Sequence, residues 1–134
     1  MKKSQVQLTW AGFDAAVDLI SAQCNKKCSG VMGASSAGQM LAIPLAFRLQ
    51  VPYLDKPKDN MLLVDGHTWN LSLSQFAYKF EDVEVWVWVD STPMGAYNAI
   101  VRLPSPELPC VAMPWQDAIL ECGTAEPFIS GFHD

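Results

Sequence analysis

The sequence predicts an α/β fold: a parallel, twisted sheet with helices on both faces, followed by a small C-terminal antiparallel hood. Two observations point to the sheet. Across roughly the first ninety residues, segments of helical periodicity alternate with short apolar runs, as in parallel sheets with crossover helices. The run from Val85 to Val89 is apolar on both faces, which a strand covered on both sides requires. After Asp90, prolines punctuate short apolar pieces, and this texture favours a hood over further α/β units.

The first predicted element is a helix over roughly residues 10–24, capped at its start by Thr9. The helix is predicted because apolar side chains recur there at steps of three and four residues: Trp10, Phe13, Ala16, Val17 and Ile20.

Residues 30–34 then predict a short buried strand, and 35–38 a turn of small residues. Residues 39–49 predict a helix that Pro44 either kinks or occupies in its first turns. Residues 51–54 predict an edge strand, since a proline cannot donate to a central ladder.

A polar loop over 55–60 leads to a second buried strand, expected at 61–64. Thr68 or Asn70 is expected to cap a third helix. The strand at 83–89 follows it. The third helix is expected to contain Leu71, Leu73, Phe76, Ala77 and Phe80.

The length and composition indicate one globular domain. The chain has 134 residues, of which 50% are hydrophobic and 17% charged, so it can pack a core and does not resemble a disordered chain. We expect a single domain over 1–134, with an α/β core at 1–90 and a hood and tail at 91–134.

The charge of the chain argues against nucleic-acid partners. The formal net charge is −5, which repels phosphate backbones. No apolar run approaches the roughly 18 residues of a membrane span, and the basic start at 1–7 is not followed by the apolar region of a signal peptide. We therefore expect a cytoplasmic protein that binds neither nucleic acid nor membrane.

The cysteines do not predict a metal site. Cys24 and Cys28 lack the spacing of a zinc ribbon, and the histidines, His67 and His133, are distant from every cysteine in sequence. Reduced thiols packed as small hydrophobic residues are the simpler interpretation, so no protein-held metal is expected.

The most informative stretch is 61–72, where an apolar run ends at Asp65 and a polar turn leads into a helical pattern. It resembles the ribose-phosphate site of type I phosphoribosyltransferases, and the chain as a whole resembles the compact purine enzymes of xanthine-guanine type. Two further matches support this: residues 30–33 leading to 37–38, and the segment 111–115. Order and spacing agree over about a hundred residues. So small a version of the family suggests a phage gene.

The resemblance implies a set of site residues, with phosphoribosyl pyrophosphate or a nucleotide as the ligand and Mg²⁺ as the cofactor if the protein is active. A phosphate is expected where backbone N–H groups and hydroxyls meet a helix start. The implied residues are Asp65 as the catalytic acid; Gly66, His67, Thr68, Asn70 and Ser72 around the phosphate; Ser35, Ser36, Ala37 and Gly38 as the pyrophosphate loop; and Val111 and Trp115 on the side of the base.

The chain departs from the family pattern at each part of this site. Gly66 stands where the second acid is expected, Trp69 where a third acid is usual, and Leu71 where a small loop glycine is usual. The pyrophosphate loop has serines in place of a basic residue, and no lysine follows Val89. Cys110 replaces an aromatic residue next to Val111.

These departures predict a phosphoribosyltransferase-like protein with an eroded active site that is inactive or weakly active and retains phosphate or nucleotide binding. Three alternatives stay open: an active purine-type transferase, a nucleotide-binding decoy without turnover, and a non-catalytic interaction protein or homo-oligomer. Trp86 and Trp88 would provide an apolar subunit surface for the last of these, unless they are core residues. The sequence leaves open whether the chain is an enzyme.

Overall fold

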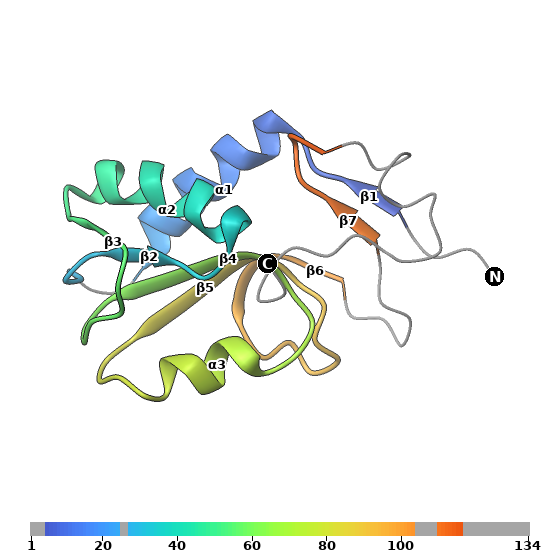
Figure 1. Cartoon of the computed structure of the whole chain (residues 1–134). Coiled ribbons are helices and arrows are strands. Elements are labelled where there is room, and N and C mark those ends of the chain that lie inside the picture. The colour runs from blue at the N-terminus through green and yellow to red at the C-terminus, as the bar shows by residue number, and fades with distance from the viewer. Residues whose placement is uncertain (1–4, 25–26, 104–109, 117–134) are drawn as a thin grey trace.

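The structure, a computed structural model, describes residues 5–24, 27–103 and 110–116. Its centre is a five-stranded sheet with the order β3-β2-β4-β5-β6, in which all neighbours are parallel. Figure 1 shows α1 and α2 on one face of this sheet and α3 on the other. The predicted α/β class with helices on both faces is therefore confirmed. The strands are β2 (Val31–Gly33), β3 (Tyr53–Leu54), β4 (Leu62–Thr68), β5 (Glu84–Asp90) and β6 (Asn98–Arg102), and the helices are α1 (Trp10–Gln23), α2 (Ser36–Leu49) and α3 (Ser72–Ala77).

Helix α1 follows the expected pattern. The side chain of Thr9 accepts a hydrogen bond from the backbone N–H of Gly12, so the predicted cap is confirmed. Phe13, Val17 and Ile20 are buried against the sheet. The short strand β3 lies at the edge of the sheet, as Pro52 predicted.

Helix α2 starts at Ser36, earlier than predicted, with Ser35 as its N-cap. The small residues 35–38 are thus its cap and first turn, not a loop before it. Two glycines allow this turn to lie directly on the sheet. A Cβ on Gly33 would lie 2.3 Å from the nitrogen of Gln39, and one on Gly38 would lie 2.6 Å from the carbonyl oxygen of Val64. Pro44 lies in the interior of α2 rather than in its first turns.

Strand β4 is longer than predicted and corrects the expected phosphate turn. Residues 65–68 are strand and are paired with β5 up to Thr68 opposite Asp90. Polar side chains suggested a turn here, but Asp65 and His67 are buried and bond to Ser35 and Ser91, which are distant in sequence, and the backbone continues in the ladder. Helix α3 is correspondingly short: Leu71 and Phe80 lie outside it, and neither Thr68 nor Asn70 is its N-cap residue.

The predicted antiparallel hood is wrong in its strand direction. Strand β6 pairs parallel with β5 and extends the main sheet. A separate two-stranded sheet joins β1 (Gln5–Gln7) to β7 (Cys110–Ala112), and these strands are also parallel. The frequent prolines correctly indicated that the strands after Asp90 are short, but they did not indicate which strands these would pair with. The predicted tail beyond 116 lies outside the described residues.

The sheet separates two apolar clusters, one under α1 and α2 and one under α3. Trp86 and Trp88 are buried in the first cluster, so the interpretation that they form a subunit surface is wrong. Cys28 is buried, Cys24 is partly buried, and both are free thiols. Among the described residues, no helix is both long and apolar enough to cross a membrane.

The close contact between α2 and β4 predicts a difference between two matched glycines, each the third residue of its helix. Gly38→Ala should lower the free energy of unfolding by about 2–3 kcal/mol, because the methyl group would overlap the backbone of Val64. Gly12→Ala, where the nearest atom is 3.3 Å away, should change it by less than about 1 kcal/mol. Urea unfolding measures both. Equal effects would show that α2 does not depend on this contact.

Candidate functional site

The candidate site lies at the carboxyl edge of the sheet. The strand order reverses between β2 and β4, and open α/β sheets bind ligands outside the carboxyl ends of strands at such a point. Ser35 follows β2 and Trp69 follows β4, so the structure brings the predicted pyrophosphate and phosphate segments together here.

Asp65 is fully buried at this point. Its Oδ1 accepts a hydrogen bond from the hydroxyl of Ser35 at 2.6 Å and one from the backbone N–H of Gly66 at 2.7 Å. The Ser35 oxygen in turn accepts from the N–H of Gly38 at 3.1 Å. Asp65 therefore holds the cap of α2 against the middle of β4, and within the predicted pyrophosphate loop only Ser36 is exposed.

Gly66 has no space for a side chain. A Cβ there would lie 2.7 Å from the Cβ of Ala37 and 2.8 Å from the Cε of Met113. Ala37 belongs to the first turn of α2, and Met113, which follows β7, is fully buried. The position where the family resemblance expects a second acid is thus packed from both sides.

The segment around Met113 is held by backbone and side-chain bonds. The N–H of Leu8 donates to the carbonyl of Ala112 at 2.8 Å, and the Gln7 amide donates to the carbonyl of Met113 at 3.0 Å. The N–H of Met113 donates to the side-chain oxygen of Gln116 at 2.9 Å. These bonds fix the thioether over Gly66.

His67 is fully buried on β4. Its Nε2 lies 2.7 Å from the hydroxyl oxygen of Ser91, and its Nδ1 has no hydrogen-bond partner in the described part of the chain. The ring lies against Trp69, with 5.5 Å between centroids. Burial lowers the pKa of His67 to about 4, against a smaller opposing effect of Asp90, so the ring is neutral at pH 7. It supplies no positive charge for a phosphate.

The amides expected to hold a phosphate already have partners. The side-chain oxygen of Asn70 accepts from the N–H of Ser72 at 2.9 Å, and the hydroxyl oxygen of Tyr97 accepts from the N–H of Ser74 at 3.2 Å. The same Tyr97 hydroxyl donates to the carbonyl of Asn70 at 2.8 Å. An anion at the start of α3 would have to replace these bonds.

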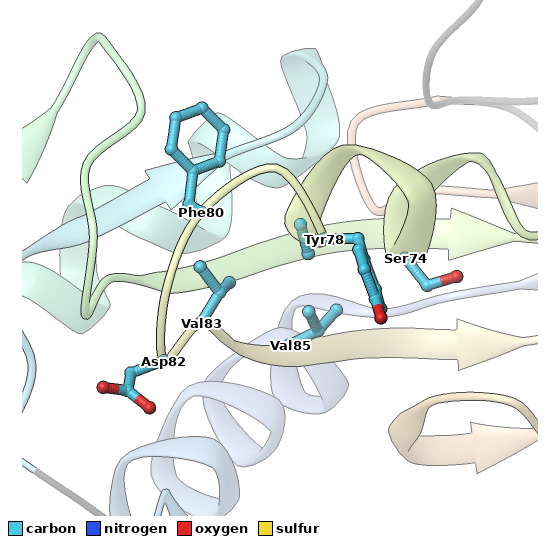
Figure 2. A pocket seen from close by; sticks show the side chains of 7 residues that line it. Ser74, Tyr78, Phe80, Asp82, Val83 and Val85 are labelled. Carbon is cyan, nitrogen blue, oxygen red and sulfur yellow. The ribbon is translucent and has the colours of Figure 1, made fainter.

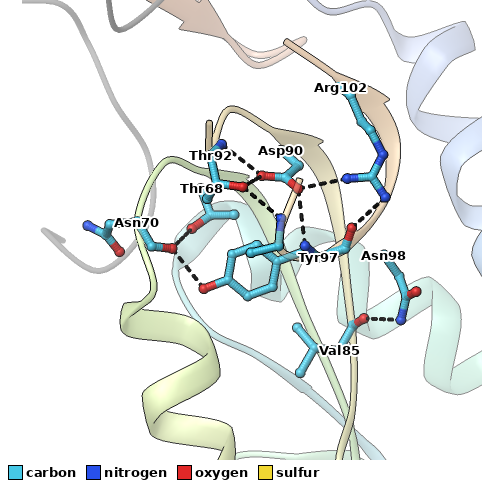
Figure 3. Close-up of polar contacts among 9 residues, drawn as sticks. Thr68, Asn70, Val85, Asp90, Thr92, Tyr97, Asn98 and Arg102 are labelled. Atoms are coloured by element: carbon cyan, nitrogen blue, oxygen red, sulfur yellow. Dashed lines mark hydrogen bonds and ion pairs between the residues drawn. The ribbon is translucent and has the colours of Figure 1, made fainter. Parts of the chain in front are cut away.

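A buried network around Asp90 was not predicted (Figure 3). Its carboxylate accepts from the N–H and hydroxyl of Thr92, from the N–H of Tyr97 and from the Arg102 guanidinium, which lies 2.9 Å away. Arg102 also donates to the carbonyl of Tyr97 at 2.7 Å. This network orders the loop after β5. The sequence signal for this network was an acid at the end of an apolar strand. Its partner Arg102 lies on β6 and could be predicted only with the correct direction of that strand.

The two residues predicted on the side of the base differ in exposure. Val111 is buried in the core, whereas Trp115 is partly exposed and lies against Trp10, with 6.0 Å between ring centroids. Trp10 contacts Phe13, which contacts Trp88, so Trp115 ends a row of aromatic rings that reaches into the core. In this structure the ring of Trp115 packs against Trp10 at the start of α1.

A shallow pocket of about 510 Å³ lies elsewhere, between α3 and the start of β5 (Figure 2). Its lining includes Ala77, Tyr78, Val83 and Val85 and contains none of the predicted site residues. Because α3 runs opposite to the strands, this pocket lies toward the amino edge of the sheet, away from Asp65.

The donor set does not fit a protein-held Mg²⁺. Within the ranges that the structure describes, no group of three or more His, Cys, Asp or Glu side chains could hold a metal ion. Mg²⁺ prefers carboxylate and other oxygen ligands, and the Oδ1 of Asp65 is already bonded to Ser35 and Gly66.

Buried His67 predicts a pH dependence of stability. Its folded-state pKa of about 4 lies below the unfolded value near 6.5, so the unfolded chain binds the extra proton as the pH falls between these values. The free energy of unfolding should therefore decrease across this window by about 3 kcal/mol. His67→Gln keeps a polar group near Ser91 but should lose this contribution. Urea unfolding at pH 7 and pH 4.5 measures the difference, and parallel pH profiles for both proteins would contradict it.

Comparisons with known proteins place the fold. No protein-family model matches the chain, and no curated protein sequence is significantly similar. A purine phosphoribosyltransferase from Pyrococcus horikoshii is similar in structure, with a TM-score of 0.68 and 13% identity over 84% of this chain and 94% of that one. An orotate phosphoribosyltransferase from Aeropyrum pernix matches with a TM-score of 0.52 and 22% identity over 67% and 70%. The chain therefore has the fold of the type I phosphoribosyltransferases.

Proposed function

We propose that this chain is a phosphoribosyltransferase-like protein that has lost ordinary phosphoribosyl transfer and keeps at most weak binding of a phosphate-bearing small molecule. The observation that carries the proposal is the packing around Gly66. No carboxylate fits beside Asp65, because Ala37 and Met113 occupy the space.

Loss of the second carboxylate matters because the transfer passes through a positively charged, oxocarbenium-like state. Catalysis there depends on preorganised charges and on positioning, and removal of one such group typically costs about 3–4 kcal/mol of transition-state stabilisation. Asp65 alone remains, and its bonds to Ser35 and Gly66 commit it to the α2 cap.

The phosphate side supports the same proposal. Ser72 and Ser74 donate their amides to Asn70 and Tyr97, so binding an anion gains few new hydrogen bonds. His67 is buried and neutral. Ser35 and Ser36 bring no positive charge to a pyrophosphate, and the guanidinium of Arg102 is paired with Asp90.

An activity assay tests the proposal directly. Purified protein with Mg²⁺, phosphoribosyl pyrophosphate and guanine, xanthine, hypoxanthine or orotate should show turnover at least about 10³-fold below the 1–10³ s⁻¹ of ordinary enzymes. Ordinary rates that are abolished by Asp65→Asn would overturn it in favour of an active transferase. Residual activity that survives Asp65→Asn would not belong to this site.

Thermal-shift titration tests the remaining binding. Inorganic phosphate, phosphoribosyl pyrophosphate and guanosine monophosphate, each with and without Mg²⁺, should stabilise the protein only at millimolar concentrations, because stabilisation grows with the ratio of ligand to Kd. Micromolar binding of a nucleotide without turnover would favour the decoy instead.

The packing around Gly66 can be tested by a double-mutant cycle. Gly66→Ala should lower the free energy of unfolding by about 2–3 kcal/mol, and Met113→Ala should lower it by about 2–5 kcal/mol. Because removal of the thioether makes room for the new methyl group, the double variant should be at least about 1 kcal/mol more stable than additivity predicts. Strict additivity in urea unfolding would show that Met113 does not close this space.

A further inference from the structure

The pocket between α3 and the start of β5 lies apart from the closed carboxyl edge and contains none of its residues. Its volume of about 510 Å³ falls within the range of about 300–1,000 Å³ that is typical of small-molecule sites. The end of α3 and its C-cap contribute Ala77 and Tyr78, and the segment entering β5 contributes Val83 and Val85. The pocket is therefore large enough for one small organic molecule.

The middle of this pocket is apolar. Figure 2 shows Val83 and Val85 between Asp82 on one side and Tyr78 on the other. Both valines are only partly buried, and the side chain of Tyr78 is 92% exposed. A ligand with an apolar body would remove this surface from water, which is favourable.

One end of the pocket carries a carboxylate without a partner. Asp82 is exposed, and within the described ranges its side chain takes part in no hydrogen bond or ion pair. Its backbone has a φ of 55°, in the left-handed region that Gly, Asn and Asp adopt more readily than other residues. The turn favours Asp or Asn at this position, and the chain carries the charged one of the two.

The surroundings leave the negative charge of Asp82 uncompensated. Glu81, the preceding residue, is an exposed second acid. Lys79 is the closest base in sequence, but its ammonium lies 5.9 Å from the centroid of the Phe76 ring. The loop 55–60 contacts this turn through the bond from the N–H of Asn60 to the carbonyl of Glu81, and its two lysines and two acids add no net charge. The partial negative charge at the C-terminal end of α3 has the same sign as Asp82.

We propose that this pocket binds a small organic amine, with its apolar body over Val83 and Val85 and its ammonium group beside Asp82. The rings of Tyr78 and Phe80, which also line the pocket, attract a cation through their π faces. An anion of the same shape is repelled by the acids. The site is independent of the proposed function, because it shares no residue with the carboxyl edge.

The open shape of the pocket sets the expected strength. We take 3-phenylpropylamine as the probe, because it joins an aromatic ring to an ammonium group through a short chain. It has about ten non-hydrogen atoms, for which an ordinary ligand efficiency gives a Kd of about 1–10 mM. A larger amine that fills more of the pocket binds more tightly.

Titration followed by the amide shifts of ¹⁵N–¹H spectra tests the site. With the amine at up to about 20 mM, the shifts should be concentrated at residues 77–85 and should saturate. The alcohol of the same skeleton, 3-phenylpropanol, should bind several-fold more weakly, and 3-phenylpropionate should produce no saturable shift there. These three compounds share the apolar body and differ in charge.

Two variants separate the charge from the fold. Asp82→Asn keeps a residue suited to the left-handed turn and should weaken amine binding by about 2- to 5-fold, as for an exposed ion pair, without changing the Kd of the alcohol. Asp55→Asn is the matched control, because Asp55 is an exposed acid outside the pocket, and it should bind the amine like the wild type.

Three results would overturn the proposal. The first is the absence of saturable shifts at residues 77–85 with the amine. The second is an equal Kd for amine and alcohol, or an unchanged Kd in Asp82→Asn, which would show that the pocket selects apolar groups without regard to charge. The third is a change of the same amide shifts when the ligand-free protein is diluted, which would show that a second copy covers the pocket.

Discussion

The contact between the first turn of α2 and the middle of β4 organises the carboxyl edge of the sheet. Three glycines make it possible: Gly33 and Gly38 let the backbones meet, and Gly66 leaves room for Ala37 and Met113. One buried acid, Asp65, then fastens the cap of α2 through Ser35. In low dielectric such a hydrogen bond is strong, and leaving the Ser35 hydroxyl without it would be costly. Helix position, strand length and site geometry all depend on this contact.

The same contact limits what the edge can do chemically. A ligand pocket requires space and free polar groups, whereas here backbone meets backbone, and the amides of Gly66, Ser72 and Ser74 have partners within the chain. Backbone amides that are already bonded within the chain have little capacity left for a ligand. In the loop after β5, the hydroxyl of Thr92 and the N–H of Tyr97 are likewise bonded within the chain, to Asp90.

The fold could be predicted from sequence to the extent that it depends on local periodicity. The α1 cap at Thr9, the buried runs at β2 and β5, and the edge position of β3 are local signals, and each was confirmed. The strand conformation of His67 and Thr68 was missed because the residues that they pair with on β5 and beyond it, such as Ser91, are distant in sequence. Parallel pairing of β6 and of β7 is likewise a tertiary choice that proline content does not encode. Asp65 was singled out from the sequence as a catalytic acid, but its link to Ser35 and the packing of Met113 over Gly66 are visible only in three dimensions. Whether Asp65 acts in catalysis stays a prediction.

Helix α2 closes the carboxyl edge through its inner face only. Ala37 and Gly38 on this face hold the edge shut, while Met40, Ile43 and Phe47 on the outer face are exposed. Because Gly38 meets the backbone of Val64 and Ser35 bonds to Asp65, α2 could leave the sheet only by breaking both contacts together. Making space beside Gly66 on the helix side therefore requires movement of the whole first turn of α2, since Ala37 belongs to that turn.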